Sequence, residues 1–129
     1  MWRQTVSPYL LLSVLAATTV RADEYDDFAA LEQQYSKLSE AGRVREAESV
    51  ARRVLALAER IYSDEPRTVA NSLNNLGNAL IGQARYDEAE KLHRRALAIR
   101  KKAFGEQDAD VAQSLLNLSN ICQSQDRRQ

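Results

Sequence analysis

The side chains best suited to covalent chemistry in this sequence are its single histidine, His93, and its single cysteine, Cys122. A histidine that accepts the thiol proton makes a cysteine nucleophilic, but such a pair needs a third group that orients the base. The sequence offers no such group, no glycine-rich phosphate loop, and too few histidines and cysteines for a zinc site. We therefore predict no enzymatic activity, no metal and no cofactor. We expect Cys122 to be a small buried apolar residue, with intermolecular pairing as the alternative.

Four asparagines fall within eight positions of the segment "NSLNNLGNAL", residues 71–80. Asn71, Asn74, Asn75 and Asn78 are spaced i, i+3, i+4 and i+7, so in a helix they share one face. Each asparagine costs a helix up to about 0.7 kcal/mol relative to alanine. A carboxamide both donates and accepts hydrogen bonds, so a row of them can bind the backbone of an extended peptide whatever its side chains. The alternatives are a solvated polar face, or asparagines that bridge neighbouring helices.

The composition predicts that helices carry these residues. The 129 residues leave room for one domain, and 44% hydrophobic with 28% charged residues is ordinary for a globular protein. Four glycines, two prolines and few aromatics, among many Ala, Leu, Glu, Arg and Gln, favour an all-helical fold. Eighteen basic and eighteen acidic residues cancel, so composition gives no reason to expect nucleic acid or an anionic membrane surface as a partner.

The first 22 residues differ from the rest of the chain. Arg3 and Arg21 are their only charged side chains, and between them runs "YLLLSVLAATTV", which at about 18 Å as a helix is too short to cross a bilayer. A weakly positive start, a short apolar run and a small-residue ending are typical of a secretory signal peptide. We predict cleavage after Ala22, export to the periplasm or the medium, no membrane insertion after cleavage, and a mature domain of residues 23–129. The alternative is a buried or interfacial N-terminal helix.

An internal repeat determines the expected fold. With a shift of 42 residues, residues 31–62 align without a gap on residues 73–104 and match at ten of 32 positions. The same shift lays residues 69–85 on residues 111–127, with nine identities in 17. Apolar residues recur at helical spacing in two blocks per copy, with a turn at "GQARYD" in the second copy. Each copy therefore predicts a helical hairpin.

Capping signals mark the ends of these helices. Asp64, Glu65 and Pro66 favour a helix start, and Phe104 with Gly105 favours a helix end. Asp108 or Asp110 is expected to cap the next helix. The predicted units are a first repeat at about residues 25–62, a second at about 66–104, and a partial third at about 108–124.

These features together resemble the tetratricopeptide repeat. The second copy meets the family pattern at Leu73, Leu76-Gly77, Leu80, Ala84-x-Tyr86, Ala89 and Ala96-Leu97. The 42-residue period is similar to the longer variety found in kinesin light chains. The first copy departs from the pattern, with Gln34-Tyr35 in place of Leu-Gly and Val44 in place of the turn tyrosine. The resemblance implies a right-handed α-solenoid of antiparallel hairpins with about two and a half units, in which His93 stands where the family commonly has a half-buried aromatic ring.

The resemblance also implies that the first helix of each hairpin lines a concave groove that binds peptides. The groove positions of the second repeat are the four asparagines, and those of the other repeats follow from the 42-residue shift. The predicted groove residues are Glu32, Gln33, Asn71, Asn74, Asn75, Asn78, Gln113, Asn117 and Asn120. Because Lys and Arg are absent from these positions, we expect the groove to prefer a neutral, extended segment of a protein or peptide partner.

Basic residues cluster instead on the predicted second helices, as Arg52-Arg53, Arg94-Arg95 and Arg100-Lys101-Lys102. They are interleaved with glutamates, so we expect a solvated convex face with i,i+4 ion pairs and no nucleic-acid binding. The alternative to a peptide-binding module is a structural one. It would be a segment of a larger repeat array, or a homodimer in which the open third helix pairs with a second copy.

Overall fold

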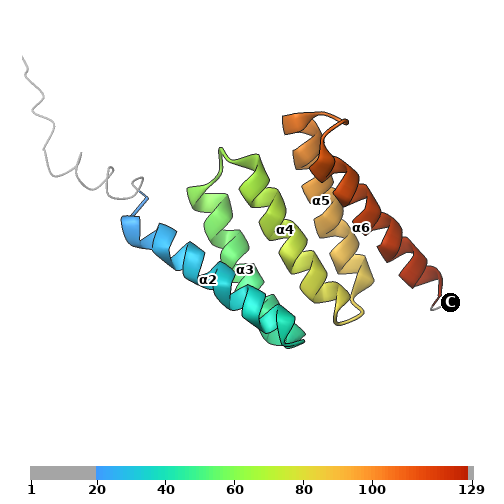
Figure 1. The fold of residues 1–129 in the computed structure, drawn as a ribbon, viewed down its shortest axis with the longest axis horizontal. Helices are drawn as coiled ribbons and strands as arrows, with labels where there is room; N and C mark the ends of the chain where they lie inside the picture. Colours follow the sequence, from blue (N-terminus) through green and yellow to red (C-terminus); the bar gives the residue numbers. More distant parts are fainter. Residues whose placement is uncertain (1–19, 128–129) are drawn as a thin grey trace, which may run out of the picture.

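The computed structural model describes residues 20–127, which form five α-helices and no strand. The helices are α2 (Ala22–Glu40), α3 (Val44–Ile61), α4 (Pro66–Ile81), α5 (Tyr86–Phe104) and α6 (Ala109–Asp126). Each helix packs on the next one along the chain, so that they form a row from α2 to α6 (Figure 1). The helices α2 with α3 and α4 with α5 are two hairpins, and α6 occupies the place of the first helix of a third.

The helix ends follow the signals in the sequence. Pro66 is the first residue of α4, where its missing N–H has no intrahelical partner to lose. Gly105 follows α5 with φ +82°, a left-handed conformation that a glycine adopts without strain. Asp108 precedes α6, and its Oδ1 accepts the backbone N–H of Asp110 at 2.9 Å. All three capping predictions are confirmed.

The turns inside the two hairpins repeat each other. In both, a residue of the turn has positive φ, and this residue is Gly42 (φ +70°) in the first hairpin and Ala84 (φ +58°) in the second. The backbone N–H groups of Arg43 and Arg85 donate to Leu38 O and Leu80 O in the same way. Because Ala84 has a Cβ atom, the second turn is the more strained of the two.

The core runs along the contacts between the helices. Leu31 in α2 and Leu73 in α4, which the 42-residue shift makes equivalent, are both buried in equivalent hairpins. Alanines fill the facing positions of the second helices, with Ala47, Ala51 and Ala58 on α3 and Ala89 and Ala96 on α5, all at most 1% exposed. Large first-helix residues thus pack on mostly small second-helix residues, and the contact of Gly77 with His93 is an exception. The predicted all-α solenoid of about two and a half hairpins is confirmed.

One prediction about the core is wrong. Cys122 is exposed, although its place in the apolar pattern suggested burial. Its equivalent in the second repeat is Leu80, which is 1% exposed because α5 covers it. Within the described residues no helix covers α6 in the way that α5 covers α4, and the thiol therefore faces outward.

Two further findings concern membranes and the N-terminus. No helix within residues 20–127 combines the length and the apolar character needed to cross a bilayer. The predicted signal peptide comprises residues 1–22, and its residues 1–19 lie outside the described part of the chain.

Candidate functional site

The nine predicted groove residues lie on the first helices α2, α4 and α6, and we call the surface they form the first-helix face. Its members differ in exposure. Gln33, Asn71, Asn78, Gln113 and Asn120 are exposed, Glu32, Asn75 and Asn117 are half-buried, and Asn74 is only 9% exposed. The face is therefore an outward-facing polar surface with one member, Asn74, turned toward the interior of the second hairpin.

The junction between α2 and α4 is held by Tyr35. Its hydroxyl donates to the backbone carbonyl of Asn75 at 2.9 Å, from a ring that is itself buried. Burial raises the pKa of Tyr35, so the phenol stays protonated and remains a donor. Burial likewise raises the pKa of Glu32, the one acidic member of the face. The bond from Tyr35 fixes the position of Asn75 relative to α2.

Asn74 contacts the fully enclosed ring of His93 on α5. The His93 side chain is 0% exposed, and its ring lies against the α4 backbone at Gly77. Oxygen and nitrogen of an amide are distinguished by their hydrogen-bond partners. In the orientation that suits both neighbours, the Asn74 amide donates to His93 Nδ1 at 3.0 Å. Burial and then the charge of Arg100 lower the pKa of His93, which keeps the ring neutral.

Arg100 is the second buried partner of the asparagines. It is 3% exposed, and its Nη2 donates to Asn71 Oδ1 at 2.6 Å while its Nη1 donates to Ser114 Oγ on α6 at 2.6 Å. The Asn74 oxygen accepts from Nη1 and Nη2 at 2.8 and 3.0 Å. The prediction that Arg100 belongs to a solvated convex face is therefore wrong. Asn71 and Asn74 accept hydrogen bonds from the buried, charged guanidinium of Arg100, which lies beneath the first-helix face.

The sequence contained a signal for this burial. Ala89, His93, Ala96 and Arg100 are spaced i, i+4, i+7 and i+11, so they share the inward stripe of α5. The expectation of a solvated face rests on the charge of the run "RKK", whereas the spacing of these four residues indicates burial of Arg100. Burial lowers the pKa of Arg100, yet a guanidinium starts so high that it stays charged at neutral pH.

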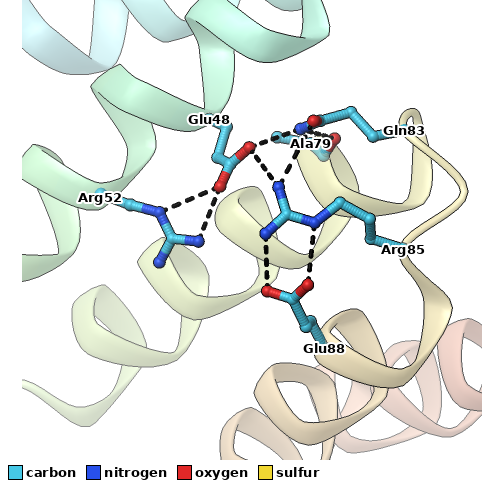
Figure 2. Close-up of polar contacts among 6 residues, drawn as sticks. All are labelled: Glu48, Arg52, Ala79, Gln83, Arg85 and Glu88. Atoms are coloured by element: carbon cyan, nitrogen blue, oxygen red, sulfur yellow. Dashed lines mark hydrogen bonds and ion pairs between the residues drawn. The ribbon is translucent and has the colours of Figure 1, made fainter.

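A second polar network joins the two hairpins (Figure 2). The carboxylate of Glu48 on α3 accepts from Gln83 Nε2 at 2.6 Å, from Arg85 Nη1 at 2.9 Å and from Arg52 Nη2 at 2.7 Å. Arg85 also donates two hydrogen bonds to the Glu88 carboxylate, from Nε at 2.9 Å and from Nη2 at 2.7 Å. Hydrogen bonds from Gln83 and Arg52 and the charges of both arginines hold the pKa of Glu48 below its ordinary value. We call these five residues the Glu48 network.

Some of the predicted surface ion pairs are present. Glu48 pairs with Arg52, and Glu90 pairs with Arg94, each at i,i+4 and 2.7 Å. Arg67 at the start of α4 contacts Asp110 and, at 3.1 Å, Asp108. Its guanidinium carbon also lies 3.8 Å from the centre of the Phe104 ring. These contacts hold the start of α6 against α4 and α5.

No group of three or more His, Cys, Asp or Glu side chains converges within residues 20–127. The imidazole of His93 is enclosed and contacts Asn74, whereas the Cys122 thiol is exposed on α6. The arrangement offers hydrogen bonds and apolar surface, which are the means of binding.

Antiparallel helical hairpins stacked with a constant repeat length define the α-solenoid class of repeat proteins. Two overlapping matches to the tetratricopeptide repeat family model cover residues 38–102 and 68–129. The chain belongs to the tetratricopeptide repeat family, whose repeats are in general protein–protein interaction modules. No curated protein matches the chain significantly.

Proposed function

We propose that the first-helix face binds an extended peptide segment of another protein. The observation that carries this proposal is a repeated pair of unengaged carboxamides. Asn78 on α4 and Asn120 on α6 are exposed equivalents, and neither side chain makes a hydrogen bond within residues 20–127. Each offers one acceptor and two donors to a ligand backbone. The shift of 42 residues places them one repeat apart on the same face.

The other members of the face have different roles in this proposal. The Asn75 side chain is also unengaged within the described residues, while its backbone is fixed by Tyr35. Gln113 donates to Asn117 at 3.1 Å, which leaves the Asn117 amide as a donor. The side chains of Asn71 and Asn74 already have hydrogen-bond partners in Arg100 and His93. Their main role in this proposal is therefore to hold the first-helix face in position, and contact with a ligand is secondary. The charge of Arg100 is covered by these two carboxamides, so the proposed ligand remains a neutral segment.

A displayed library of random dodecapeptides, selected on the full chain, supplies the probe for a test. The double variant Asn78→Ala/Asn120→Ala should weaken binding of a selected peptide by roughly 5- to 150-fold, because each of the two lost hydrogen bonds contributes about 0.5–1.5 kcal/mol. A matched control is Arg45→Ala/Lys91→Ala, two exposed positions on the second helices. Methylation of single backbone nitrogens in the peptide then shows whether its backbone is recognised. Equal affinity for all three proteins would refute the proposal.

The second candidate function is structural, as a self-associating module. The observation that favours it is the exposure of two leucines on α6, Leu115 and Leu116. Sedimentation over a hundredfold range of concentration distinguishes the two functions, because a free peptide receptor stays monomeric and a self-associating unit does not.

We also propose export of the mature domain through the segment of residues 1–22. Support comes from the sequence of that segment alone, with its short apolar run and small-residue ending. Expression of the full chain in a bacterial host, followed by cell fractionation and intact-mass measurement, should give a periplasmic species that begins at Asp23. A cytoplasmic species that retains residue 1 or 2 would contradict export.

A further inference from the structure

The internal repeat shows which face of α6 lacks a neighbour within residues 20–127. On α4, the positions that pack on α5 are buried: Ala70, Leu73, Gly77 and Leu80, with Asn74 at the edge of the first-helix face. Their equivalents on α6 are all exposed, and Leu115 and Leu116 have 48% and 59% of their surface free. We call this surface the open face, and it consists of Ala112, Leu115, Leu116, Ser119 and Cys122.

The opposite end of the described stack is different in character. The outer face of α2 would receive a preceding helix, and its positions are equivalent to the α4 residues that pack on α3. These α2 positions are Asp27, Ala30, Gln34 and Lys37, and all are exposed. A polar outer face is how repeat proteins end a stack in water. Head-to-tail stacking of two copies would set the leucines of the open face against Asp27 and Lys37, so a second copy does not fit in that way.

The two complete hairpins show what kind of helix covers such a face. In the second hairpin, a small residue on the first helix, Gly77, meets a large one on the second, His93. In the first hairpin the same two positions hold Tyr35 and Ala51, so the sizes are exchanged and both are buried. The open face has Ser119 at this position. A serine Cβ would meet a ring placed like that of His93, so an alanine-sized residue is required opposite it.

The neighbouring position leads to the same type of helix. Asn74 accepts hydrogen bonds from the buried Arg100, and the equivalent pair in the first hairpin is Glu32 with Ala58. On the open face this position is Leu116, which has no acceptor. A buried guanidinium there would lose its partners, at a large desolvation cost. The matching helix therefore has a small apolar residue at this position, as α3 has Ala58.

The turn arginines specify the start of the matching helix. Arg43 forks onto Glu46 and Arg85 forks onto Glu88, in each case an acidic residue in the first turn of the second helix. The next arginine in this 42-residue series is Arg127, at the end of α6. Beside it lies a polar hollow of about 720 Å³, whose lining includes Glu90, Gln125 and Asp126. Glu90 is the equivalent of Glu48, so the hollow is the place where a second network like that of Glu48 would form.

We propose that the open face binds an amphipathic helix of a partner protein that resembles α3 and lies antiparallel to α6. Its contact stripe has alanine-sized residues opposite Leu115, Leu116 and Ser119, and its first turn has an acidic residue that pairs with Arg127. Self-pairing of α6 would place leucine against leucine, whereas the buried residues of the second helices α3 and α5 include no leucine. The open face borders the first-helix face at Leu116, the equivalent of Asn74, but the proposal does not depend on peptide binding there.

The probe for the test is a synthetic peptide with the sequence of residues 44–61, VREAESVARRVLALAERI, labelled at its N-terminus. A covalent staple between positions 45 and 49, which are both exposed in α3, keeps the peptide helical so that helix formation does not limit binding. Binding to the full chain is followed by fluorescence anisotropy. We expect saturable binding that weakens at least tenfold with Leu115→Gln/Leu116→Gln and about threefold with Arg127→Ala.

Two controls make the result specific to this face. The first is the Asn78→Ala/Asn120→Ala protein, which should bind the α3 peptide as the wild type does. The second is a stapled peptide in which the residues equivalent to Ala51 and Ala58 are replaced by arginine, which should not bind. Absence of saturable binding, or equal binding by the Leu115→Gln/Leu116→Gln protein, overturns the proposal. A dimer that sediments as such and dissociates in the Leu115→Gln/Leu116→Gln protein also overturns it, because the occupant is then a second copy.

Discussion

The ring of His93 lies so close to Gly77 that a Cβ atom added to the glycine would be 2.6 Å from Nε2. The side chain of His93 is wholly buried, and the second hairpin closes around this contact. The glycine of the Leu76-Gly77 pair is thus required by the close approach of a ring and not by an unusual backbone angle.

Gly77→Ala should lower the free energy of unfolding by about 1–3 kcal/mol, because the added methyl group overpacks the site. At an open helix position the same change would stabilise by up to about 1 kcal/mol. In a His93→Ala background the ring is absent, so Gly77→Ala should become neutral or stabilising. Urea titration of the four proteins measures the reversal. A similar cost in both backgrounds would mean that the contact with His93 is not the cause.

The two hairpin turns provide a matched pair of substitutions. Ala84→Gly should raise the free energy of unfolding by about 0.5–1 kcal/mol, because glycine adopts the left-handed conformation without the Cβ strain. Gly42→Ala should lower it by a similar amount at the equivalent turn. Opposite signs in thermal or urea unfolding are the expected result, and equal signs would contradict the turn assignment.

Arg100 and Asn74 should be energetically coupled. Asn74→Leu removes an acceptor from a buried guanidinium, and we expect a loss of about 1.5–3 kcal/mol. Arg100→Met leaves Asn74 and Ser114 without their donor. The double variant resembles the apolar environment of Leu116, so it should be more stable than the sum of the two losses by about 1 kcal/mol or more. Additive losses in a urea double-mutant cycle would show that the two side chains act independently.

The buried imidazole gives stability a dependence on pH. The pKa of His93 is lowered from its ordinary 6.5, so the unfolded chain binds a proton that the folded chain does not. Stability is therefore constant above about pH 7 and falls as the pH drops below 6.5, by at most about 1.4 kcal/mol per pH unit. His93→Gln should flatten the curve between pH 7 and 5. A further fall below pH 4.5 is expected in both proteins, because the pKa of Glu48 is lowered too.

Glu48 and Glu90 are equivalent residues with different numbers of partners. Glu48 accepts from Gln83 and two arginines, whereas the ion pair of Glu90 is with Arg94. Glu48→Ala should therefore cost about 1–2 kcal/mol of unfolding free energy, and Glu90→Ala should cost less. Urea titration at low and at 1 M salt compares them. Equal losses would show that the Glu48 network does not hold the hairpins together.

The fold could be predicted because it depends on periodic features. The 42-residue shift, the helical spacing of leucines and alanines, and the caps at Pro66, Gly105 and Asp108 are all local patterns in the sequence. Each of these patterns depends directly on the backbone conformation, so the helices and hairpins can be predicted from them. The helix of the partial third repeat, α6, can be predicted for the same reason.

The candidate site was predicted less well, because its contacts join residues from different helices. The role of Asn74 depends on His93 and Arg100, which are 19 and 26 positions away and reach it only after the hairpin closes. The prediction for Arg100 is wrong because it rests on the charge of the residue, whereas the position of Arg100 on the inward stripe of α5 determines its burial. The prediction for Cys122 is wrong because the burial pattern of α4 does not apply to α6, which no described helix covers as α5 covers α4.

The exchange of sizes between Tyr35 with Ala51 and Gly77 with His93 bears on how a duplicated sequence folds faithfully. In a chain with two similar hairpins, the first helix of one hairpin can pair with the second helix of the other during folding. If α2 took the place of α4 in the hairpin with α5, Tyr35 would collide with His93. If α4 took the place of α2 in the hairpin with α3, Gly77 and Ala51 would leave a void. The different residue sizes at these four positions therefore favour the native pairing of each helix over the exchanged pairing.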